Sequence, residues 1–131
     1  MKTLSYYTEK KTSEVLKKYG AFFAFSDKQF NENKKENTKY SRLYGGLIAP
    51  SENAKKIMSE LKKVTDEGIN QDIKENGIKN IIHRELANYE CQIVGDITDA
   101  YDILKDYGIT KEQVLKEYKI FYQKCIKNDW F

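Results

Sequence analysis

The sequence predicts an α+β fold: a small three-stranded sheet packed with about five helices, the last two of which form a C-terminal helical hairpin. Apolar residues recur at helical spacing in several stretches that begin at a capping residue and end near a glycine. Short apolar runs rich in aromatic and β-branched residues lie between those stretches and are typical of strands. The chain has 131 residues without an internal repeat or linker, so we expect residues 1–131 to form a single globular domain.

The first helix is predicted over residues 5–19. Its apolar stripe consists of Val15, Leu16 and Tyr19. Gly20 follows as a left-handed C-cap, because glycine adopts positive φ at little cost. Residues 21–25, with the sequence Ala-Phe-Phe-Ala-Phe, form a short continuous apolar run that predicts a buried strand.

A short helix and a second strand are predicted next. Ser26 followed by Gln29 is a capping-box pattern, which predicts a helix over residues 27–34. Residues 40–50 have the composition of a strand, but Gly45-Gly46 interrupts it. A glycine pair inside a strand indicates a bulge, a sharp bend or the close approach of another backbone.

Residues 51–76 have the clearest helical pattern in the chain. Ser51 stands at the N-cap position, and the apolar residues recur at helical spacing: Ala54, Ile57, Met58, Leu61 and Val64. Gly68 weakens the pattern without ending it. A further helix is predicted over residues 78–87, with its apolar side formed by Ile78, Ile81, Ile82 and Leu86.

Residues 90–94 are predicted to be the third strand of the sheet. The helix after it is capped by Asp96 or Thr98 and ends at Gly108. A second capping-box pattern in residues 110–113 starts the last helix. Its expected buried residues are Val114, Leu115, Tyr118, Phe121, Tyr122 and Cys125.

Residues 101–123 also have the outline of a DNA-binding helix-turn-helix. The exposed N-terminal end of a recognition helix normally carries short polar or arginine side chains. Here that end carries Lys111, Glu112 and Gln113, and Glu112 would repel phosphate. A plain helical hairpin is therefore the favoured interpretation.

Charge and composition limit the function. The chain has 23 Lys and Arg residues against 20 Asp and Glu residues, a formal net charge of +3. Only Arg42 and Arg84 are arginines, the residue type better suited to bidentate contacts with phosphates and bases. The sequence pI is about 8.7, and dedicated nucleic-acid modules usually lie above about 9. Nucleic-acid binding stays open as an alternative but is not favoured.

The cellular compartment is predicted from the pattern of apolar residues. No apolar run approaches the roughly 20 residues of a membrane helix, and the N-terminal residues have no apolar signal region. We therefore expect a protein of the cytoplasm of the cell in which it acts, one that does not bind a membrane. Cys91 and Cys125 are expected to be free, reduced thiols, with a bridge between them as the less favoured alternative.

The sequence contains few residues in catalytic patterns. It has no glycine-rich phosphate loop, no nucleophile elbow and no HExxH pair. The single histidine, His83, is expected on the polar side of its helix, exposed or linked to a cap. Its neighbours Glu90 and Cys91 are not at the spacing of zinc ligands. We predict a protein that is not an enzyme and uses no cofactor or metal; an enzyme with a carboxylate-only site is a weaker alternative.

Tyr40, Arg42 and Tyr44 form the best candidate contact surface. They alternate along the predicted strand, so they would share one face of the sheet. Two tyrosines beside an arginine can stack on bases or act as a hot spot for a protein partner. The alternative is a half-buried strand that uses tyrosine for its β-propensity.

A second candidate surface is acidic. Asp99, Asp102 and Asp106 fall on one stripe of a predicted helix. Regularly spaced carboxylates could imitate the charge of a nucleic-acid backbone or meet a basic partner. The alternative is a solvated helix face.

Several short segments resemble one protein family. They are residues 20–26, Gly-Ala-Phe-Phe-Ala-Phe-Ser; residues 44–50, Tyr-Gly-Gly-Leu-Ile-Ala-Pro; residues 84–90, Arg-Glu-Leu-Ala-Asn-Tyr-Glu; and the shorter Gln29-Phe30, residues 95–97 and residues 107–110. Over roughly residues 18–118 the chain resembles a family of small uncharacterised proteins encoded by phages, plasmids and other mobile elements of low-GC bacteria. The resemblance implies a context in which small proteins often inhibit host defences, including CRISPR nucleases.

Two functional hypotheses follow. The leading one is a non-enzymatic protein that binds and inhibits a host defence factor, such as an RNA-guided nuclease, through Tyr40, Arg42 and Tyr44 and through the acidic stripe. The alternative is a small lysine-rich nucleic-acid-binding protein that uses Tyr40 or Tyr44 as stacking platforms.

Overall fold

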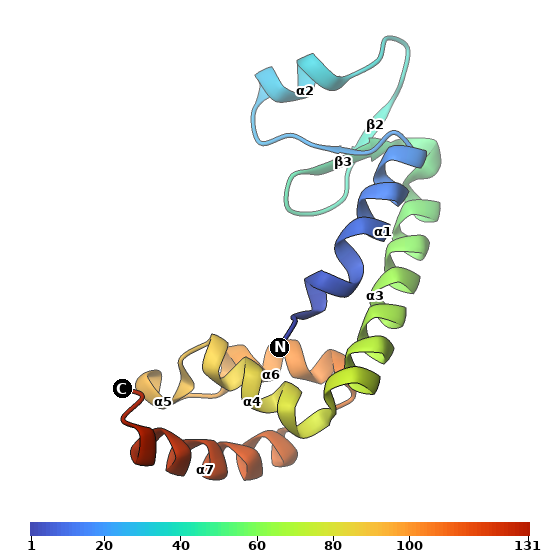
Figure 1. The fold of residues 1–131 in the computed structure, drawn as a ribbon. Helices are drawn as coiled ribbons and strands as arrows, with labels where there is room; N and C mark the ends of the chain where they lie inside the picture. Colours follow the sequence, from blue (N-terminus) through green and yellow to red (C-terminus); the bar gives the residue numbers. More distant parts are fainter. The chain divides into compact units, whose positions relative to one another are not determined.

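The computed structural model describes residues 1–131 as seven α-helices, two 3-10 segments and three strands (Figure 1). In chain order these are α1 (Leu4–Lys18), β1 (Phe22–Phe23), α2 (Asp27–Asn33), β2 (Tyr40–Arg42), β3 (Leu47–Pro50), η1 (Ser51–Asn53), α3 (Ala54–Asn76), α4 (Ile78–Asn88), α5 (Cys91–Val94), α6 (Thr98–Leu104), η2 (Lys105–Tyr107) and α7 (Lys111–Asn128). The α+β class is therefore confirmed.

The chain divides into two compact units. The first, Leu4–Gly68, contains the sheet and is called the sheet unit below. The second consists of Met1–Thr3 with Ile69–Phe131 and is called the helical unit. Helix α3 contributes its first part to the sheet unit and its last part to the helical unit. The expectation of a single domain stays a prediction.

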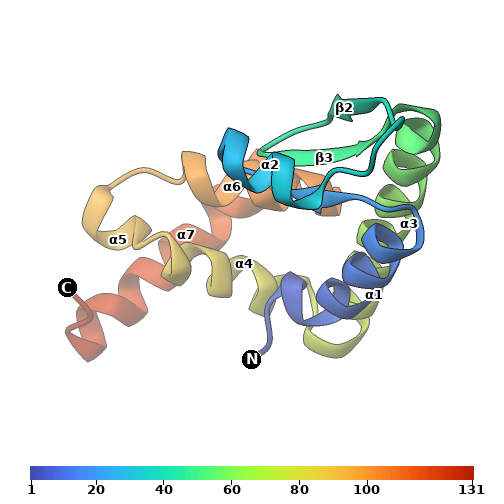
Figure 2. The same ribbon diagram turned by 90° about the horizontal axis from the view of Figure 1, so that it is seen from above.

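The sheet has the strand order β1-β3-β2, and both strand pairs are antiparallel. Figure 2 shows β2 and β3 side by side. The central strand is β3, in which all four residues are buried. Ile48 lies opposite Phe22 on one side and opposite Arg42 on the other. This register fixes which side chains share a face of the sheet.

The predicted strand over residues 40–50 is a hairpin rather than one interrupted strand. Gly45 and Gly46 have φ angles of 49° and 83°, a region that is costly for residues with a Cβ atom. They form the turn between β2 and β3, which is closed by the N–H of Leu43 donating to the carbonyl of Leu47 at 2.9 Å. A Cβ atom on Gly46 would also collide with the ring of Phe25.

The predicted third strand over residues 90–94 is wrong. Those residues form the short helix α5, which starts after Glu90 in the left-handed conformation and ends at Gly95. Within α5 only Cys91 is buried, while Ile93 and Val94 are exposed. An apolar run this short does not distinguish strand from helix by periodicity.

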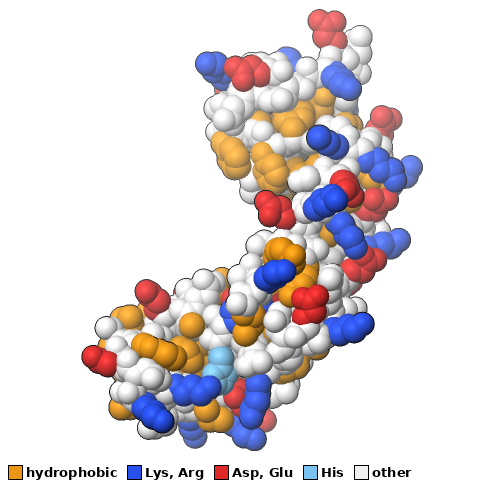
Figure 3. Space-filling view, in the orientation of Figure 1, with side chains coloured by type: hydrophobic (Ala, Val, Ile, Leu, Met, Phe, Trp, Pro, Cys, Tyr) orange, Lys and Arg blue, Asp and Glu red, His pale blue; other side chains and the backbone are white.

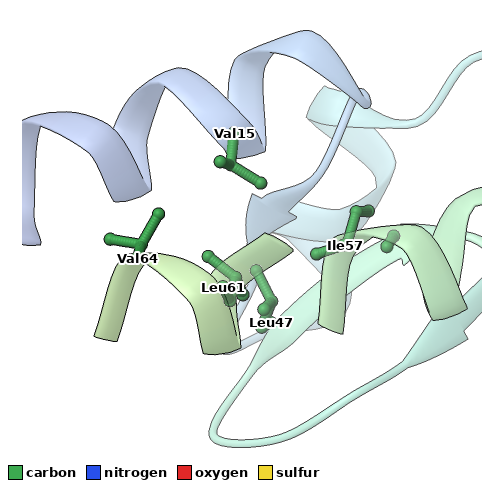
Figure 4. Packing of buried hydrophobic residues seen from close by; sticks show 6 residues of the cluster. Val15, Leu47, Ile57, Leu61 and Val64 are labelled. Carbon is green, nitrogen blue, oxygen red and sulfur yellow. The ribbon is translucent and has the colours of Figure 1, made fainter. Parts of the chain in front are cut away.

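A hydrophobic cluster forms the core of the sheet unit. It joins α1, β3 and α3 through Val15, Leu47, Ala49, Ile57, Leu61 and Val64 (Figure 4). Leu47, Ala49 and Ile57 have no exposed surface. The side of β3 that carries Leu47 and Ala49 is therefore the core face of the sheet.

Gly68 allows α1 and α3 to approach closely. A Cβ atom at this position would collide with the side-chain methyl group of Thr8 and meet Leu4 Cδ1 at 3.3 Å. Gly68 lies inside α3 although glycine is a poor helix former, and its missing side chain leaves the space in which α1 packs.

Helices α4, α6 and α7 supply most of the core of the helical unit. Helix α4 contacts α6 and α7, and also the short helix α5. The buried residues of the three helices include Ile81, Ile82, Leu86, Leu104, Val114 and Phe121. The capping box at the start of α7 is confirmed, since Thr110 and Gln113 bond to each other's backbone N–H groups. The C-terminal helical hairpin stays a prediction. None of the helices combines the length and the apolar character needed to cross a bilayer.

Replacing Gly68 with alanine tests the close approach. We expect Gly68→Ala to lower the free energy of unfolding by about 1 kcal/mol, because overpacking outweighs the gain in helix propensity. In a Thr8→Ala background, which removes the colliding methyl group, the same change should raise it by about 1 kcal/mol. Urea unfolding followed by far-UV circular dichroism measures both effects. A stabilising effect in both backgrounds would show that the helices are not in close contact there.

Candidate functional site

The sheet has one face turned to the core and a second face, partly covered by Phe30 of α2, which is called the open face below. Residues directly opposite in antiparallel strands point to the same side, and side chains alternate along a strand. Ile48 and its partner Arg42 therefore lie on the face opposite to Leu47 and Ala49, and Tyr40 lies on the same face as Arg42. The predicted shared face of Tyr40 and Arg42 is present, and it is turned away from the core.

A cavity of about 520 Å³ lies on this open face. Helix α2, strands β2 and β3, the segment between β1 and α2, and the turn before β3 contribute to its wall. The lining residues are Ala24, Phe25, Ser26, Asp27, Phe30, Tyr40, Ser41, Arg42, Gly46 and Ile48. The volume falls within the range of about 300–1,000 Å³ that is common for ligand-binding pockets.

Three aromatic rings support one wall of the cavity. Tyr40 packs edge-on against Phe22 and Phe30, with ring centroids 5.6 Å apart in both pairs. The backbone N–H of Lys35 donates to the Tyr40 hydroxyl at 2.9 Å. Because edge-to-face contacts and this hydrogen bond hold the ring, Tyr40 presents a fixed surface rather than a mobile side chain.

Arg42 is the cationic residue of the cavity. It is exposed, and its guanidinium makes no hydrogen bond or ion pair with the rest of the chain. The chain's other arginine, Arg84, is by contrast fully engaged in the helical unit. An arginine that its own protein leaves unpaired, beside a cavity with both polar and apolar lining residues, is available to a carboxylate or phosphate of a partner.

Exposed aromatic side chains adjoin the cavity. Phe25 is 74% exposed and stacks on Phe23 with a centroid distance of 6.2 Å and an interplanar angle of 8°. Figure 3 shows hydrophobic side chains at the surface of the sheet unit, with charged side chains of both signs around them. Large exposed aromatic groups of this kind are typical of interaction surfaces.

Tyr44 does not belong to the same face. The prediction placed it on one strand with Tyr40 and Arg42, but β2 ends at Arg42 and Tyr44 lies in the bend before the glycine turn. Its side chain is exposed and does not line the cavity. The turn breaks the period of two on which the prediction depended.

The acidic stripe lies in the helical unit. Asp99 and Asp102 are on α6 and Asp106 is on η2, and all three are exposed. Asp102 is 3.6 Å from Lys105 in an exposed ion pair. This arrangement agrees with a solvated helix face as well as with a contact surface, so the role of these residues stays a prediction.

A second cavity, of about 510 Å³, lies in the helical unit beside α5 and α7. Its lining residues are Gln92, Gly95, Tyr118, Lys119, Tyr122 and Gln123. Tyr118 donates from its hydroxyl to the carbonyl of Cys91 at 3.3 Å. Cys91 and Cys125 are both buried and free, as expected, and burial raises the pKa of each thiol. This cavity contains no unpaired arginine and no catalytic pair.

His83 is not an exposed or cap-linked residue, as the sequence suggested. Its side chain is 18% exposed and its Nε2 atom lies 2.9 Å from Glu117 Oε1 on α7. The imidazole also packs edge-on against Phe121. The pair joins α4 to α7, so its role is structural.

A buried ion network is the other feature that sequence reasoning missed. Asp72 is completely buried, and both of its oxygens accept hydrogen bonds from Arg84, at 2.9 and 3.0 Å. The Tyr107 hydroxyl donates to Asp72 at 2.6 Å, and the side-chain amide of Asn76 also donates to Asp72, at 2.7 Å. Arg84 also donates to Glu85 at 2.9 Å. The network connects the end of α3 with α4 and η2.

Hydrogen bonding decides the ionisation of this network. Burial opposes the charge of Asp72, but the hydrogen bonds from Arg84, Tyr107 and Asn76 outweigh burial and lower the pKa of the carboxyl group. Burial and the neighbouring Asp72 raise the pKa of Tyr107. The hydrogen bonds of Asp72 to Arg84 and Tyr107 connect α3 with α4 and η2. The structure contains no group of three or more His, Cys, Asp or Glu side chains arranged to hold a metal ion.

A signal for these buried charges was present in the sequence. Glu85 stands between Ile82 and Leu86, and Glu117 stands between Val114 and Phe121, at helical spacing on the apolar stripes. A carboxylate within an apolar stripe is rarely buried unless it is paired. The partner, however, could not be found from spacing alone.

Comparison with known proteins identifies the family. The model of a family of unknown function, DUF7659, matches residues 4–124, and the chain belongs to this family. No curated protein and no solved structure is significantly similar to the chain.

Removing Asp72 tests the network. We expect Asp72→Ala to lower the free energy of unfolding by about 3–5 kcal/mol, because Arg84 would be left buried without its main partner. The matched control is Asp102→Ala, which breaks an exposed pair with Lys105 in the same unit and should change stability by less than about 0.5 kcal/mol. Urea unfolding measured by the fluorescence of Trp130, the only tryptophan, reports on the helical unit. Equal effects of the two changes would contradict this role.

The network also predicts the acid dependence of stability. Because the pKa of Asp72 is lower in the folded than in the unfolded protein, where it is near 3.8, the folded state binds fewer protons. The contribution of Asp72 to the free energy of unfolding is complete above its pKa in the unfolded protein, and it is lost as the pH falls through the lowered pKa of the folded protein. Stability should therefore fall between about pH 4 and pH 2, and the fall should be shallower in Asp72→Asn. Urea unfolding at each pH measures the slope, and an unchanged slope would exclude Asp72 as its source.

Proposed function

We propose that this member of the DUF7659 family is a non-enzymatic interaction protein that binds a protein partner through the open face of its sheet. The observation that carries the proposal is the cavity that combines the fixed ring of Tyr40 with the unpaired guanidinium of Arg42. The narrower part of the proposal, taken from the family resemblance, is that the partner is a host defence factor such as an RNA-guided nuclease, which the protein inhibits in the host cytoplasm.

The composition of the open face supports a protein partner. Residues that dominate the energy of protein interfaces are enriched in tyrosine and arginine and lie in desolvated pockets surrounded by apolar groups. Tyr40 and Arg42 meet this description, since Phe30 and Ile48 line the same cavity. The exposed Phe25 extends the apolar surface next to it.

A second candidate function is nucleic-acid binding. Its specific support is the charge of the sheet unit, in which residues 4–68 include 13 lysine and arginine residues against 9 aspartate and glutamate residues. Phe25 and Tyr40 could stack on bases while lysines contact phosphates. Binding of this kind depends steeply on salt, because it releases counterions.

A pull-down from the bacterial host, with and without nuclease treatment of the lysate, tests the proposal. We expect a stoichiometric protein partner that survives nuclease treatment. Arg42→Glu and Tyr40→Ala should each reduce its recovery about tenfold or more, because both residues line the binding cavity. Lys10→Glu, an exposed charge reversal on α1, is the matched control and should leave recovery unchanged.

The same experiment separates the alternatives. Loss of all proteins on nuclease treatment, with affinity for a single-stranded oligonucleotide falling by about tenfold or more between 50 and 200 mM salt, would favour the nucleic-acid binder. A partner that is lost only in the triple variant Asp99→Lys, Asp102→Lys, Asp106→Lys would move the contact surface to the acidic stripe. A partner that none of these variants affects would contradict both placements.

A further inference from the structure

We propose that the free edge of β2 accepts an extended, acidic segment of the partner as an additional strand, with an apolar side chain in the cavity and a carboxylate at Arg42. This inference rests on the proposed function and names the part of a protein partner that the open face binds. It depends on three features of the sheet unit: the unpaired backbone of β2, the register of its side chains, and its charge.

Only some of the backbone N–H and C=O groups of β2 form hydrogen bonds with the neighbouring strand β3. The carbonyl of Lys39 accepts from the N–H of Ser51, and the N–H of Leu43 donates to the carbonyl of Leu47. In an antiparallel pair the residues that bond to the neighbouring strand alternate with residues that point away from it. The N–H and C=O groups of Tyr40 and Arg42 therefore point away from β3, at the edge of the sheet.

These groups suit a peptide backbone. An extended peptide supplies donors and acceptors in alternation, so it can satisfy both the N–H and the C=O groups of Tyr40 and Arg42. The phosphate oxygens of a nucleic acid only accept hydrogen bonds, so its backbone lacks the regular alternation of donors and acceptors that a peptide strand offers to these groups. The edge thus favours a protein segment over a nucleic acid.

The register relates the edge to the cavity. Side chains of an added strand that lie opposite Tyr40 and Arg42 would point to the open face, because opposite residues share a face. They would be two positions apart in the segment, one next to the aromatic wall and the other next to the guanidinium. The edge is only three residues long, so the cavity and Arg42 must supply most of the specificity.

The charge around the edge selects an acidic segment. Arg42 makes no ion pair within the chain, and Lys39, directly before β2, also makes none. Lys34 lies over the ring of Phe30, 5.9 Å from its centroid, in the segment that leads to β2. A carboxylate placed opposite Arg42 would meet these positive charges, whereas Asp27 is the one carboxylate among the residues that line the cavity.

Peptide binding tests the inference. The probes are two terminally blocked extended peptides of about eight residues, in which a charged residue comes two positions before a phenylalanine. In antiparallel pairing with β2 this order puts phenylalanine opposite Tyr40 and the charged residue opposite Arg42. The charged residue is glutamate in the Phe–Glu peptide and lysine in the otherwise identical Phe–Lys peptide. We expect the Phe–Glu peptide to bind the full chain about tenfold more tightly than the Phe–Lys peptide, with the largest backbone amide shifts in NMR spectra at Tyr40 and Arg42. Methylation of the peptide's backbone nitrogens should weaken binding.

A charge exchange is the decisive control. In Arg42→Glu the preference should reverse, so that the Phe–Lys peptide binds more tightly, whereas Lys10→Glu should keep the original order. The inference is overturned if neither peptide binds, if the preference ignores the charge at residue 42, or if the amide shifts lie outside β2 and the cavity. Binding of a single-stranded oligonucleotide alone would also overturn it.

The outcomes separate this inference from the proposed function. A nuclease-resistant partner that depends on Arg42, without binding of either peptide, would refute strand addition and leave the proposed function in place. Charge-dependent peptide binding without any captured protein would support the edge site and count against the proposed inhibitor.

Discussion

The alternation of side chains along β3 is the constraint on which the proposed binding surface depends. Leu47 and Ala49 enter the core between α1 and α3, so Ile48 must point to the other face. The partners of Ile48 in the register, Phe22 and Arg42, are placed on that face with it. A shift of the register by one residue would exchange the two faces and remove the cavity.

The turn at Gly45-Gly46 fixes the register in which β2 and β3 pair. Both residues have positive φ, and Gly46 leaves room for the ring of Phe25, which lines the cavity. The core and the open face are therefore not independent. The same hairpin that buries Leu47 also sets the orientation of Arg42, and a core substitution in β3 would disturb binding as well as stability.

Local signals in the sequence predicted the parts of the fold that depend on neighbouring residues. The caps of α2 and α7 and the C-cap glycine of α1 are examples, because each involves residues within one turn of a helix. The run at residues 90–94 failed, since its length does not separate strand from helix. For residues 40–50 the glycine pair correctly predicted a sharp bend as one of three alternatives, and the structure shows that this bend separates two paired strands.

The candidate site could be predicted only in part. Alternation correctly placed Tyr40 and Arg42 on one face, whereas Tyr44 lies beyond the end of the strand. Phe22, Phe30 and Asp27 were not linked to them, because contacts across a sheet and between separate elements leave no mark in local spacing. The same holds for the bond between Asp72 and Arg84, which brings α3 and α4 together through two buried charges. Contacts between residues that are far apart in the sequence could not be predicted from local patterns.

Hydrogen exchange of the free and partner-bound protein tests the central claim most directly, because it reports on the backbone of β2 without a substitution. In the free protein the outward N–H groups of Tyr40 and Arg42 should exchange rapidly, as they have no strand partner. The account predicts that the captured partner slows exchange in residues 38–44 more than elsewhere. Unchanged exchange there, with slowing confined to residues 98–107, would contradict it.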